Sequence, residues 1–572
     1  MKSFTQGTRF SQSLLFTAVI SSTALVGCSN SDSDNTPGES DAAAFTVSGT
    51  AVNFYTGEHV DNASISIAGD INGVHTELGE TTTDNSGRFS LSYDNVPTRL
   101  VISGQNDEFG EYSIIVLNED QESRVTAANL ALQPVDVNAV FDPETDSTIE
   151  LGTTPVIELA ANSLVDNNGN TPEGDVSGRL TIIDPSADPS LMPGNYQTID
   201  NQGDVSLIES FGAISAVFED SNGEELNLAE NQTATIRIPL ASGINPNTAD
   251  ATIPLFYFDE TTGYWVEEGI ATLTQLANNT YVYEGTVSHF TVWNADKVYE
   301  TININGCVVD ETGEPVANAD VTSQGRDYIG SANTTSNDAG LFSLPARFNS
   351  DVLISARNGA VSNTLEVDTD NTDVDLTNNC LVLSPDAVNI SLTWGEAPDD
   401  LDSHLFGPAN ADGTEQFHVY YGNHPVIVNE VVMDLDVDDT SSFGPEVISI
   451  PRFPYPGTYQ YLVHQFSNES DIVSSPARVK LTIGEQEIFF SPSEATNPLT
   501  EEWAVFNIEV DANLNPTIVP VQEFVEGWVE DGLEEGPIEE GLIEENFEAF
   551  ATPANTRALE PKTNQSIKPS YK

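Results

Sequence analysis

Short runs in which apolar and polar residues alternate with a period of two recur along most of this chain, for example in Ala63–Ile67, Thr235–Ile238 and Val479–Ile483. Such alternation is typical of strands with one buried face, because successive side chains of a strand point to opposite faces. Turn signals such as Asn-Gly and Pro-Gly separate the runs at roughly 8 to 12 residues. No segment before residue 520 has a long apolar stripe of helical period. The sequence therefore predicts an all-β fold of tandem β-sandwich domains.

The first 27 residues have the features of a bacterial secretory leader. Lys2 and Arg9 are basic, and Leu14–Val26 is an apolar stretch of 13 residues, too short to span a bilayer as a stable helix. The stretch closes on Leu25-Val26-Gly27-Cys28, which resembles the lipobox cut by a lipoprotein signal peptidase. The resemblance implies that residues 1–27 are removed and that Cys28 is acylated and anchors the chain in the membrane.

The residues after Cys28 bear on where that anchor lies. Ser29 follows the cysteine, and the lack of Asp at that position implies the outer membrane in such lipoproteins. Residues 28–44 are rich in Ser, Asp, Asn, Pro and Gly, a composition that cannot bury a core, so they are expected to form a flexible tether. An ordinary secretory leader with a chance cysteine remains the alternative.

Charge excludes one class of partner. The chain has 18 Lys and Arg residues against 90 Asp and Glu residues, a formal net charge of -72. Nucleic-acid binding depends on basic residues that neutralise phosphates, so nucleic acid is not expected as a partner. Such an acidic surface suits solubility in salty water or a need for divalent cations, and composition does not separate these two interpretations.

An internal repeat marks two domains. The first copy runs from Val47-Ser48-Gly49 to Thr83–Leu91, and the second runs from Ile304-Asn305-Gly306 to Asn337–Leu344. Each copy ends in a turn whose glycine is expected to adopt positive φ before a strand that opens on a buried Phe. The two copies, over 45–133 and 299–386, resemble the carboxypeptidase regulatory-like domain, a transthyretin-type sandwich. In that family the module accompanies a catalytic domain, so the resemblance implies a spacer or binding module.

The block between the copies, 134–298, contains aromatic strands and turns in Ala251–Asp259, Gly263–Gly269 and Val287–Asn294. These motifs resemble the extracellular segment of cartilage intermediate layer proteins. Two interpretations exist for its aromatic residues: Trp265 and Trp293 belong to the core and His289 caps a strand by hydrogen bonding, or the three stack on a ligand.

The block 387–512 begins with Ile390–Gly395 and Asp399–Leu405 and continues through Met433–Thr440. It resembles the YfaP-like family, an uncharacterised group of β-sandwich proteins of bacterial surfaces and periplasm. The resemblance implies another sandwich but no chemistry.

Aspartates of this block suggest a metal site. On an extended strand Asp434, Asp436 and Asp438 share one face, and Asp400 and Asp402 lie on a segment that faces them if the two strands pack. Clustered oxygens suit Ca²⁺, which takes six to eight oxygen ligands. The alternatives are carboxylates that cap turns or protect an exposed strand edge, and a Zn²⁺-like site that adds His404 and His418. Asp439 and Glu446 lie at the turn that follows.

Cysteine usage agrees with export. With Cys28 taken by the anchor, Cys307 and Cys380 remain as an even pair in the second regulatory-like copy. Alignment to the first copy places them on the opening and closing strands, so a disulfide is expected, worth roughly 4 kcal/mol in the chain-entropy model. Two buried free thiols are the alternative.

The last segment, 513–572, changes character. Val521–Phe550 has 11 acidic residues and no basic one. Val521, Phe524 and Val525 follow helical spacing, so short acidic amphipathic helices or a disordered tail are expected. A second apolar set of this kind follows at Ile538, Leu542, Ile543 and Phe547. Such a piece either docks on the fourth sandwich or binds a partner.

Signatures of catalysis are missing from the sequence, which has no Gly-x-Ser-x-Gly elbow, no His-Glu-x-x-His and no Walker loop. The sequence therefore predicts a lipid-anchored outer-membrane protein that acts as a non-catalytic binding, adhesion or scaffolding module for an envelope protein or glycan. The alternative is an envelope enzyme, or an enzyme accessory, that acts on polysaccharide or peptide.

Overall fold

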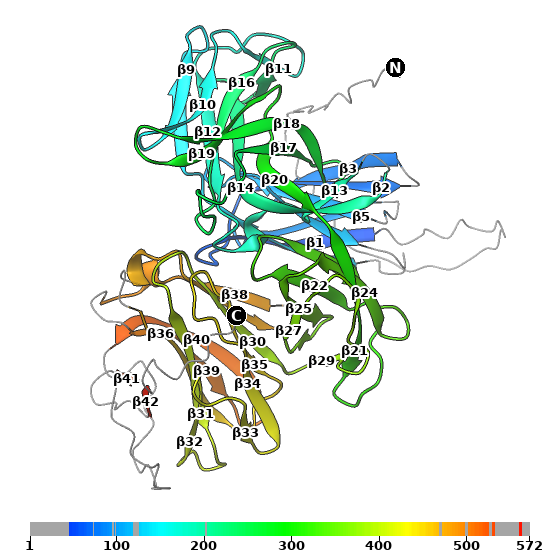
Figure 1. Cartoon of the computed structure of the whole chain (residues 1–572), viewed down its shortest axis with the longest axis vertical. Coiled ribbons are helices and arrows are strands. Elements are labelled where there is room, and N and C mark those ends of the chain that lie inside the picture. The colour runs from blue at the N-terminus through cyan, green and yellow to red at the C-terminus, as the bar shows by residue number, and fades with distance from the viewer. Residues whose placement is uncertain are drawn as a thin grey trace, which may run out of the picture.

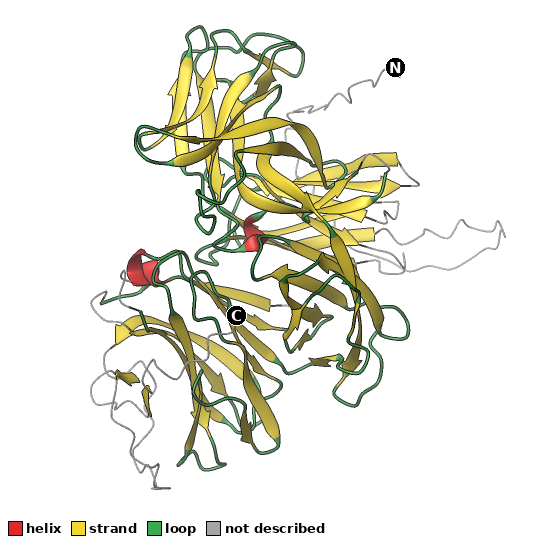
Figure 2. Ribbon diagram, viewed as in Figure 1, coloured by secondary structure: helices red, strands yellow, loops and turns green. Residues whose placement is uncertain are grey.

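The computed structural model describes residues 45–71, 74–93, 97, 99–117, 125–200, 203–467, 472–484, 486–497, 502–525, 529–531 and 560–562. Within these ranges the regular elements are strands and three short 3-10 helices, Pro189–Leu191, Ile472–Ser474 and Pro492–Glu494 (Figure 2). This confirms the predicted all-β fold of tandem β-sandwiches. No helix in these ranges is long and apolar enough to cross a membrane. The leader, Cys28 and the tether lie outside the described residues.

The first sandwich has two sheets that enclose one core. A three-stranded sheet has the order β4-β1-β7, and a four-stranded sheet has the order β3-β2-β5-β6. The strands are β1 (Phe45–Asn53), β2 (Ser64–Ile71), β3 (Val74–Thr82), β4 (Arg88–Tyr93), β5 (Arg99–Gln105), β6 (Tyr112–Leu117) and β7 (Val125–Leu132). Alternate residues of β2, such as Ile65 and Ile67, are fully buried, as period-two alternation predicts.

The second sandwich is built from thirteen strands joined in one hydrogen-bonded network. They are β8 (Val137–Phe141), β9 (Ser147–Leu151), β10 (Thr154–Leu159), β11 (Leu164–Asp166), β12 (Val176–Ile183), β13 (Gln197–Ile199), β14 (Val205–Glu219), β15 (Glu225–Leu228), β16 (Ala234–Pro239), β17 (Thr252–Asp259), β18 (Tyr264–Gln275), β19 (Tyr281–Val287) and β20 (Val292–Tyr299). Trp265 and Trp293 are 0% and 1% exposed, so they belong to cores rather than to a ligand-stacking surface. His289 contributes its backbone carbonyl, which accepts a hydrogen bond from Trp293 Nε1 at 3.0 Å.

The third sandwich repeats the plan of the first. Its strands are β21 (Thr301–Asp310), β22 (Asp320–Gly325), β23 (Ser331–Thr335), β24 (Leu341–Arg347), β25 (Asp351–Arg357), β26 (Val361–Ser362), β27 (Leu365–Asp368), β28 (Val374–Asp375) and β29 (Leu381–Ser384). The predicted turn is present in both copies: Gly87 and Gly340 have φ of +67° and +69°, and Phe89 and Phe342 of the strands that follow are buried. Only glycine adopts this backbone region without steric cost, which explains its place in both turns.

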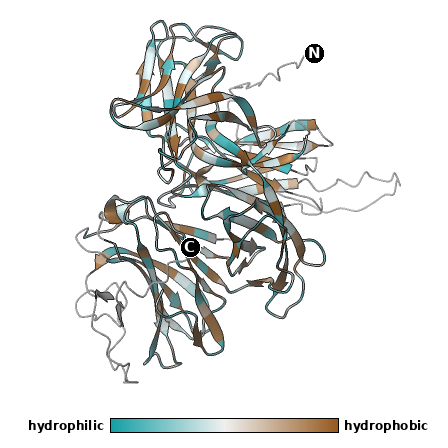
Figure 3. Cartoon of the chain, in the orientation of Figure 1, coloured by the Kyte–Doolittle hydropathy of each residue, from teal (hydrophilic) through white to brown (hydrophobic). Residues whose placement is uncertain are grey.

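The fourth sandwich has a six-stranded sheet, β33-β34-β35-β30-β37-β38, and a five-stranded sheet, β32-β31-β36-β39-β40. The strands are β30 (Val388–Thr393), β31 (Leu401–Pro408), β32 (Gln416–Val419), β33 (Val426–Val428), β34 (Val431–Val437), β35 (Glu446–Ile450), β36 (Gly457–Gln465), β37 (Arg478–Ile483), β38 (Gln486–Phe490), β39 (Glu502–Val510) and β40 (Pro516–Val525). Figure 3 shows brown apolar residues recurring along the strands of all four sandwiches.

Strand β40 corrects the predicted end of this sandwich at residue 512. It pairs antiparallel with β39, and Phe524, at 3% exposed, belongs to the core. Residues 516–525 are therefore a strand and not part of a helical or disordered tail. Beyond them the structure describes β41 (Val529–Asp531) and β42 (Glu560–Lys562), which pair in parallel; the second expected amphipathic set, within 538–547, lies outside the described residues.

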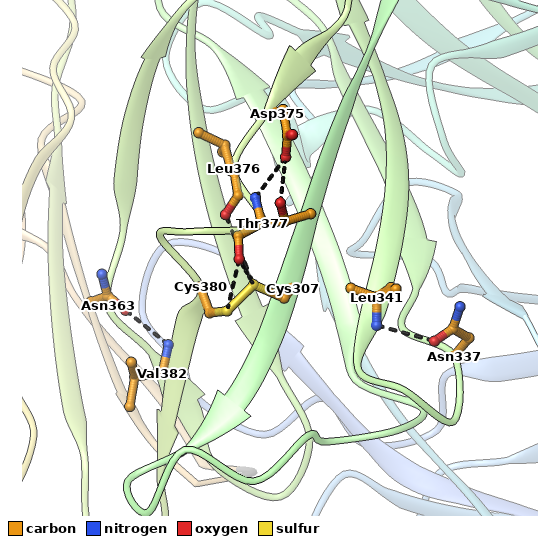
Figure 4. Close-up of a disulfide and its surroundings, with 9 residues drawn as sticks. All are labelled: Cys307, Asn337, Leu341, Asn363, Asp375, Leu376, Thr377, Cys380 and Val382. Atoms are coloured by element: carbon orange, nitrogen blue, oxygen red, sulfur yellow. Dashed lines mark hydrogen bonds between the residues drawn. A yellow bond between two sulfur atoms is a disulfide. The ribbon is translucent and has the colours of Figure 1, made fainter.

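The two cysteines of the third sandwich form a disulfide. Cys307 on β21 and Cys380, just before β29, have Cα atoms 4.6 Å apart and are separated by 73 positions in the sequence (Figure 4). The two strands run parallel and side by side from Val308 and Leu381 onward. The turn before Cys380 is held by the Asp375 carboxylate, which accepts bonds from the Thr377 N–H and hydroxyl. The bridge therefore ties the opening strand of the third sandwich to its closing strand.

The four sandwiches pack against one another rather than following in an extended row (Figure 1). Arg99 of the first donates hydrogen bonds to the carbonyls of Thr262 and Gly263 in the second. The second contacts the third through an ion pair between Glu209 and Arg347 at 3.2 Å. Further contacts join the third to the fourth: Arg326 pairs with Asp439 at 2.8 Å, Arg357 pairs with Glu487 at 3.0 Å, and Leu353, Val437 and Val447 form a small apolar cluster.

Arg478, on β37 of the fourth sandwich, contacts both the first and the second sandwich. Its guanidinium lies 3.3 Å from the ring centre of Phe54 in the first sandwich and 3.9 Å from that of Phe489 in its own. The same side chain pairs with Asp188 of the second sandwich at 2.9 Å and is almost fully buried. Burial lowers the pKa of Arg478 to about 10, which leaves it charged at neutral pH. Three sandwiches therefore meet at one arginine.

Candidate functional site

A cleft of about 530 Å³ lies between the first and second sandwiches. Its floor is the outer face of the first sandwich's four-stranded sheet, where small residues such as Ser64, Ser66 and Ala68 leave room above the strands. The opposite wall comes from β14 and β15 of the second sandwich and includes edges of Phe218 and Phe290. The contacts of Arg99 with the second sandwich fix the two walls relative to each other.

Carboxylates enter this cleft from both walls. Glu77, Glu80 and Glu111 belong to the first sandwich, and Glu225 and Glu260 belong to the second. None of its lining residues is a lysine or an arginine. Five carboxylates without a basic side chain make the cleft attractive to a cationic group and unfavourable for an anionic ligand. The sequence gives no signal for this site, because its two walls are brought together only by the packing of separate domains.

A second group of carboxylates lies at one edge of the fourth sandwich. Ligand oxygens of Asp402, Asp438 and Glu446 all lie within 4.8 Å of one another, and Asp402 and Glu446 are almost fully buried. Asp402 comes from β31 in one sheet, Glu446 opens β35 in the other, and Asp438 follows β34. The Glu446 carboxylate also accepts a hydrogen bond from the Ser403 N–H, which ties the two sheets together.

This triad contains only part of the predicted metal-binding set. Asp402 and Asp438 come together, whereas Asp434 pairs with His424 at 2.9 Å. That hydrogen bond raises the pKa of His424. Asp436 accepts bonds from the Thr364 N–H of the third sandwich, at 2.8 Å, and from the Ser449 hydroxyl.

Asp400, a predicted ligand, and Asp439, from the turn that follows the aspartate row, are not members of the triad. Asp400 is buried, and its N–H donates to the Ser467 hydroxyl at 2.9 Å. Asp439 takes the ion pair with Arg326. The five aspartates therefore do not form one site, since side chains on a shared strand face still take different partners. Glu446 is the member that the aspartate row did not predict, although it lies in the turn named beside it.

The triad's donor set fits a hard cation. Three carboxylates offer up to six oxygens, the ligand type and number that Ca²⁺ prefers, and a divalent ion offsets the repulsion among like charges brought out of water. Sharing protons among the three groups is the other way to reduce that repulsion.

Histidines gather on the neighbouring strands but do not complete a metal site. His404 Nδ1 and His418 Nε2 are 2.8 Å apart, and burial lowers the pKa of His418 to about 3, so it stays neutral. His464 lies across from Asp402 in the register and approaches Glu502 to 3.7 Å. Among the described residues, the carboxylate triad is the group of metal-binding side chains whose ligand atoms converge within 4.8 Å. His464 and Glu502 were not predicted, because their neighbourhood depends on strand order.

Comparisons with known proteins do not assign this chain to a family. No family model matches the chain, and no curated protein matches it. Among solved structures, it is similar to BcpA, the major pilin subunit of Bacillus cereus, at 9% identity and a TM-score of 0.14, over 60% of this chain and 99% of that one. The full-length major pilin SpaD of Corynebacterium diphtheriae gives 8% identity and a TM-score of 0.16, over 61% and 99%.

A 9R-lipoxygenase from Cyanothece PCC8801 gives 16% identity and a TM-score of 0.14, over 22% of this chain and 21% of that one. This chain therefore spans about a fifth of the lipoxygenase's length. TM-scores this low carry no argument about function, which rests on the geometry of the two carboxylate sites themselves.

Proposed function

We propose that this chain is a lipid-anchored protein of the outer membrane that acts as a non-catalytic binding module, with the cleft between its first two sandwiches as the binding site. The observation that carries the proposal is the lining of that cleft: five glutamates from two domains and no basic residue. A partner with exposed lysines or arginines, such as a cationic segment of another envelope protein, complements this charge.

The packing of the sandwiches supports a binding role. Arg99 holds the two cleft walls together, and Arg478 ties the fourth sandwich to both of the domains that form the cleft. A site whose walls are already in place loses less entropy when a partner binds. The lipobox-like sequence at Cys28 would hold the body at the membrane, and the tether would let it reach a partner in the envelope.

Binding in the cleft is tested by calorimetry with a lysine-rich peptide, a neutral oligosaccharide and a glutamate-rich peptide as probes. We expect the lysine-rich peptide alone to bind, with an affinity that falls as salt rises. The double variant Glu80→Gln/Glu260→Gln should weaken binding by about tenfold, at roughly 0.5–1 kcal/mol per ion pair. Glu150→Gln, an exposed position on β9 outside the cleft, serves as the control. Equal binding by both variants would overturn the proposal.

The same cleft also favours a second candidate, an enzyme that acts on polysaccharide, because carboxylates line it from both walls and glycosidases act with a pair of carboxyl groups. Turnover separates the two functions. Release of reducing ends from an envelope polysaccharide, abolished in Glu80→Gln or Glu260→Gln, would establish the enzyme, whereas binding without turnover supports the module.

The anchor has its own test. Cys28→Ala should abolish acylation and release the chain from the membrane fraction, because only a thiol at that position accepts the lipid. Retention of the variant in the membrane after a carbonate wash would contradict the anchor without affecting the cleft.

A further inference from the structure

The floor of the cleft between the first two sandwiches contains a β-bulge. Strand β3 ends the four-stranded sheet and pairs antiparallel with β2. The pairing shifts between Ile67 and Ala68, so that Leu78 and Gly79 of β3 together oppose Ile67 of β2. Such an extra residue changes the direction of the side chains on one side of it relative to those on the other.

The two residues of the bulge explain why it forms at this position. Gly79 has φ of +150°, a conformation that favours glycine, and a β-carbon there would lie 3.1 Å from Leu91 Cδ2 of the opposite sheet. Leu78 packs its side chain against the core of the first sandwich. One side chain and one glycine therefore share the place that a single core residue takes in a regular strand.

The bulge brings two glutamates to the same face of the sheet. Residues three positions apart on a regular strand point to opposite faces. Because of the extra residue, Glu77 lies opposite Ala68 and Glu80 lies opposite Ser66, and these two positions of β2 share a face. Both glutamates consequently line the cleft.

The spacing of this pair is fixed by the strand beside it. Ala68 and Ser66 are two residues apart on β2, which places Glu77 and Glu80 about 7 Å apart along the strand, at about 3.4 Å per residue. Neither carboxylate has an ion-pair partner in the described part of the chain. The floor therefore presents two negative charges at a set separation.

An amide oxygen lies on the same floor. Gln105 of β5 is opposite Ser64 of β2, and both residues line the cleft. Gln105 Oε1 is shielded from solvent and accepts no hydrogen bond from the residues that the structure describes. An acceptor of this kind suits an N–H group of a ligand, as the two carboxylates do.

We propose that the cleft binds an extended segment whose basic residues occupy alternate positions, with one basic side chain on Glu77 and the next on Glu80. This inference rests on the proposed function and adds the spacing that the partner must have. Alternate residues of an extended chain share a face and repeat every 7 Å or so, which matches the separation of the two glutamates. Basic residues that are adjacent, or three apart, point to opposite faces, so only one of them reaches the floor.

The spacing is tested by competition against a fluorescently labelled lysine-rich peptide. Three capped peptides of one composition contain two lysines among serines and threonines, and differ only in whether the lysines are adjacent, at alternate positions or three apart. The peptide with alternate lysines should bind about threefold more tightly than the other two, the effect of one more surface ion pair. In Glu77→Gln the three peptides should bind alike.

A relocated charge is the matched control. In Glu77→Gln/Thr82→Glu the second carboxylate moves to the other side of Glu80, to an exposed position two residues away on the regular part of β3, so the preference should return. Glu260→Gln, on the opposite wall, should weaken binding of all three peptides and leave the preference unchanged.

The outcomes separate this inference from the proposed function. Equal affinity of the three peptides for the parent protein would overturn the inference and leave the binding role of the cleft standing. A preference that survives in Glu77→Gln, or that fails to return with the relocated charge, would overturn it in the same way. Failure of the labelled lysine-rich peptide to bind at all would overturn both.

Discussion

Asp436 is a carboxylate whose ionisation opposes the fold at neutral pH. Burial raises its pKa to about 6 from an ordinary value of 3.8, and its two hydrogen-bond donors, the Thr364 N–H and the Ser449 hydroxyl, offset only part of that cost. A carboxyl with a raised pKa contributes its full stability below pH 3.8 and loses it as the pH rises through about 6. It lies at the contact between the third and fourth sandwiches, so its charge bears on their docking.

Asp436→Asn removes that charge and keeps an oxygen that accepts both hydrogen bonds. We expect the variant to be more stable than the parent at pH 8 by about 2–3 kcal/mol and nearly equal at pH 4, because each unit of pKa is worth about 1.4 kcal/mol. Urea unfolding of both proteins at the two pH values measures the difference. A variant less stable than the parent at pH 8 would contradict the assigned sign.

The carboxylate triad predicts a response to Ca²⁺. An ion bound by the folded state alone adds about 2.7 kcal/mol at 100 times its dissociation constant, so the whole chain should unfold at a higher temperature with Ca²⁺ than with a chelator. Asp438→Asn and Glu446→Gln should shrink this shift, because each removes one charged ligand from the triad. Asp434→Asn, in the same row but paired with His424, should retain it. Coincident melts at constant ionic strength would rule the ion out.

At the scale of single residues, the sequence predicted which side chains could bind a cation better than it predicted which neighbours they contact. Of the five aspartates expected to act together, Asp402 and Asp438 do. Asp434 pairs with His424 instead, and Asp436 accepts hydrogen bonds from Thr364 and Ser449, residues that no local spacing connects to it. Turn glycines were predictable because their conformation depends on the residue itself, as the positive φ of Gly87 and Gly340 confirms.

At the scale of elements, alternation identified strands where it was regular and failed where it was not. In β40, Gln522 has φ of +49° and the pairing with β39 shifts register between Ala504 and Phe506. Such a bulge adds a residue and changes which side chains face the core. Val521, Phe524 and Val525 are then spaced as on a helix although they lie on a strand.

Strand β40 is therefore expected to contribute to the stability of the fourth sandwich. Phe524→Ala should lower the free energy of unfolding by about 3–5 kcal/mol, because it leaves a cavity in the core. Val519→Ala on the same strand, at an exposed position, should change it by less than about 0.5 kcal/mol. Equal effects of the two substitutions on the urea midpoint would mean that residues 516–525 do not pack as described.

At the scale of the whole molecule, four sandwiches were expected in series, and they pack against one another instead. The reason lies in a core cluster whose buried residues come from two domains. Phe54 and Val101 of the first sandwich share a cluster with Tyr196 and Trp265 of the second. In the sequence, each of these four residues is indistinguishable from an ordinary core residue of its own strand. The pattern of apolar residues therefore carries no information about the contact between domains.

Arg478 provides the test of this packing between domains. Arg478→Gln removes the guanidinium from between Phe54 and Phe489 and leaves Asp188 partly buried without its partner, a loss of about 3–5 kcal/mol for a buried pair. Because the lost contacts join domains rather than build them, the sandwiches should stay folded while the fourth separates from the first two. Small-angle scattering should then give a larger radius of gyration with unchanged far-UV circular dichroism. Arg237→Gln is the matched control, since its partners Glu158 and Glu284 lie in its own sandwich and its loss should leave the shape unchanged. An unchanged radius of gyration for Arg478→Gln would show that the remaining contacts hold the four sandwiches together without it.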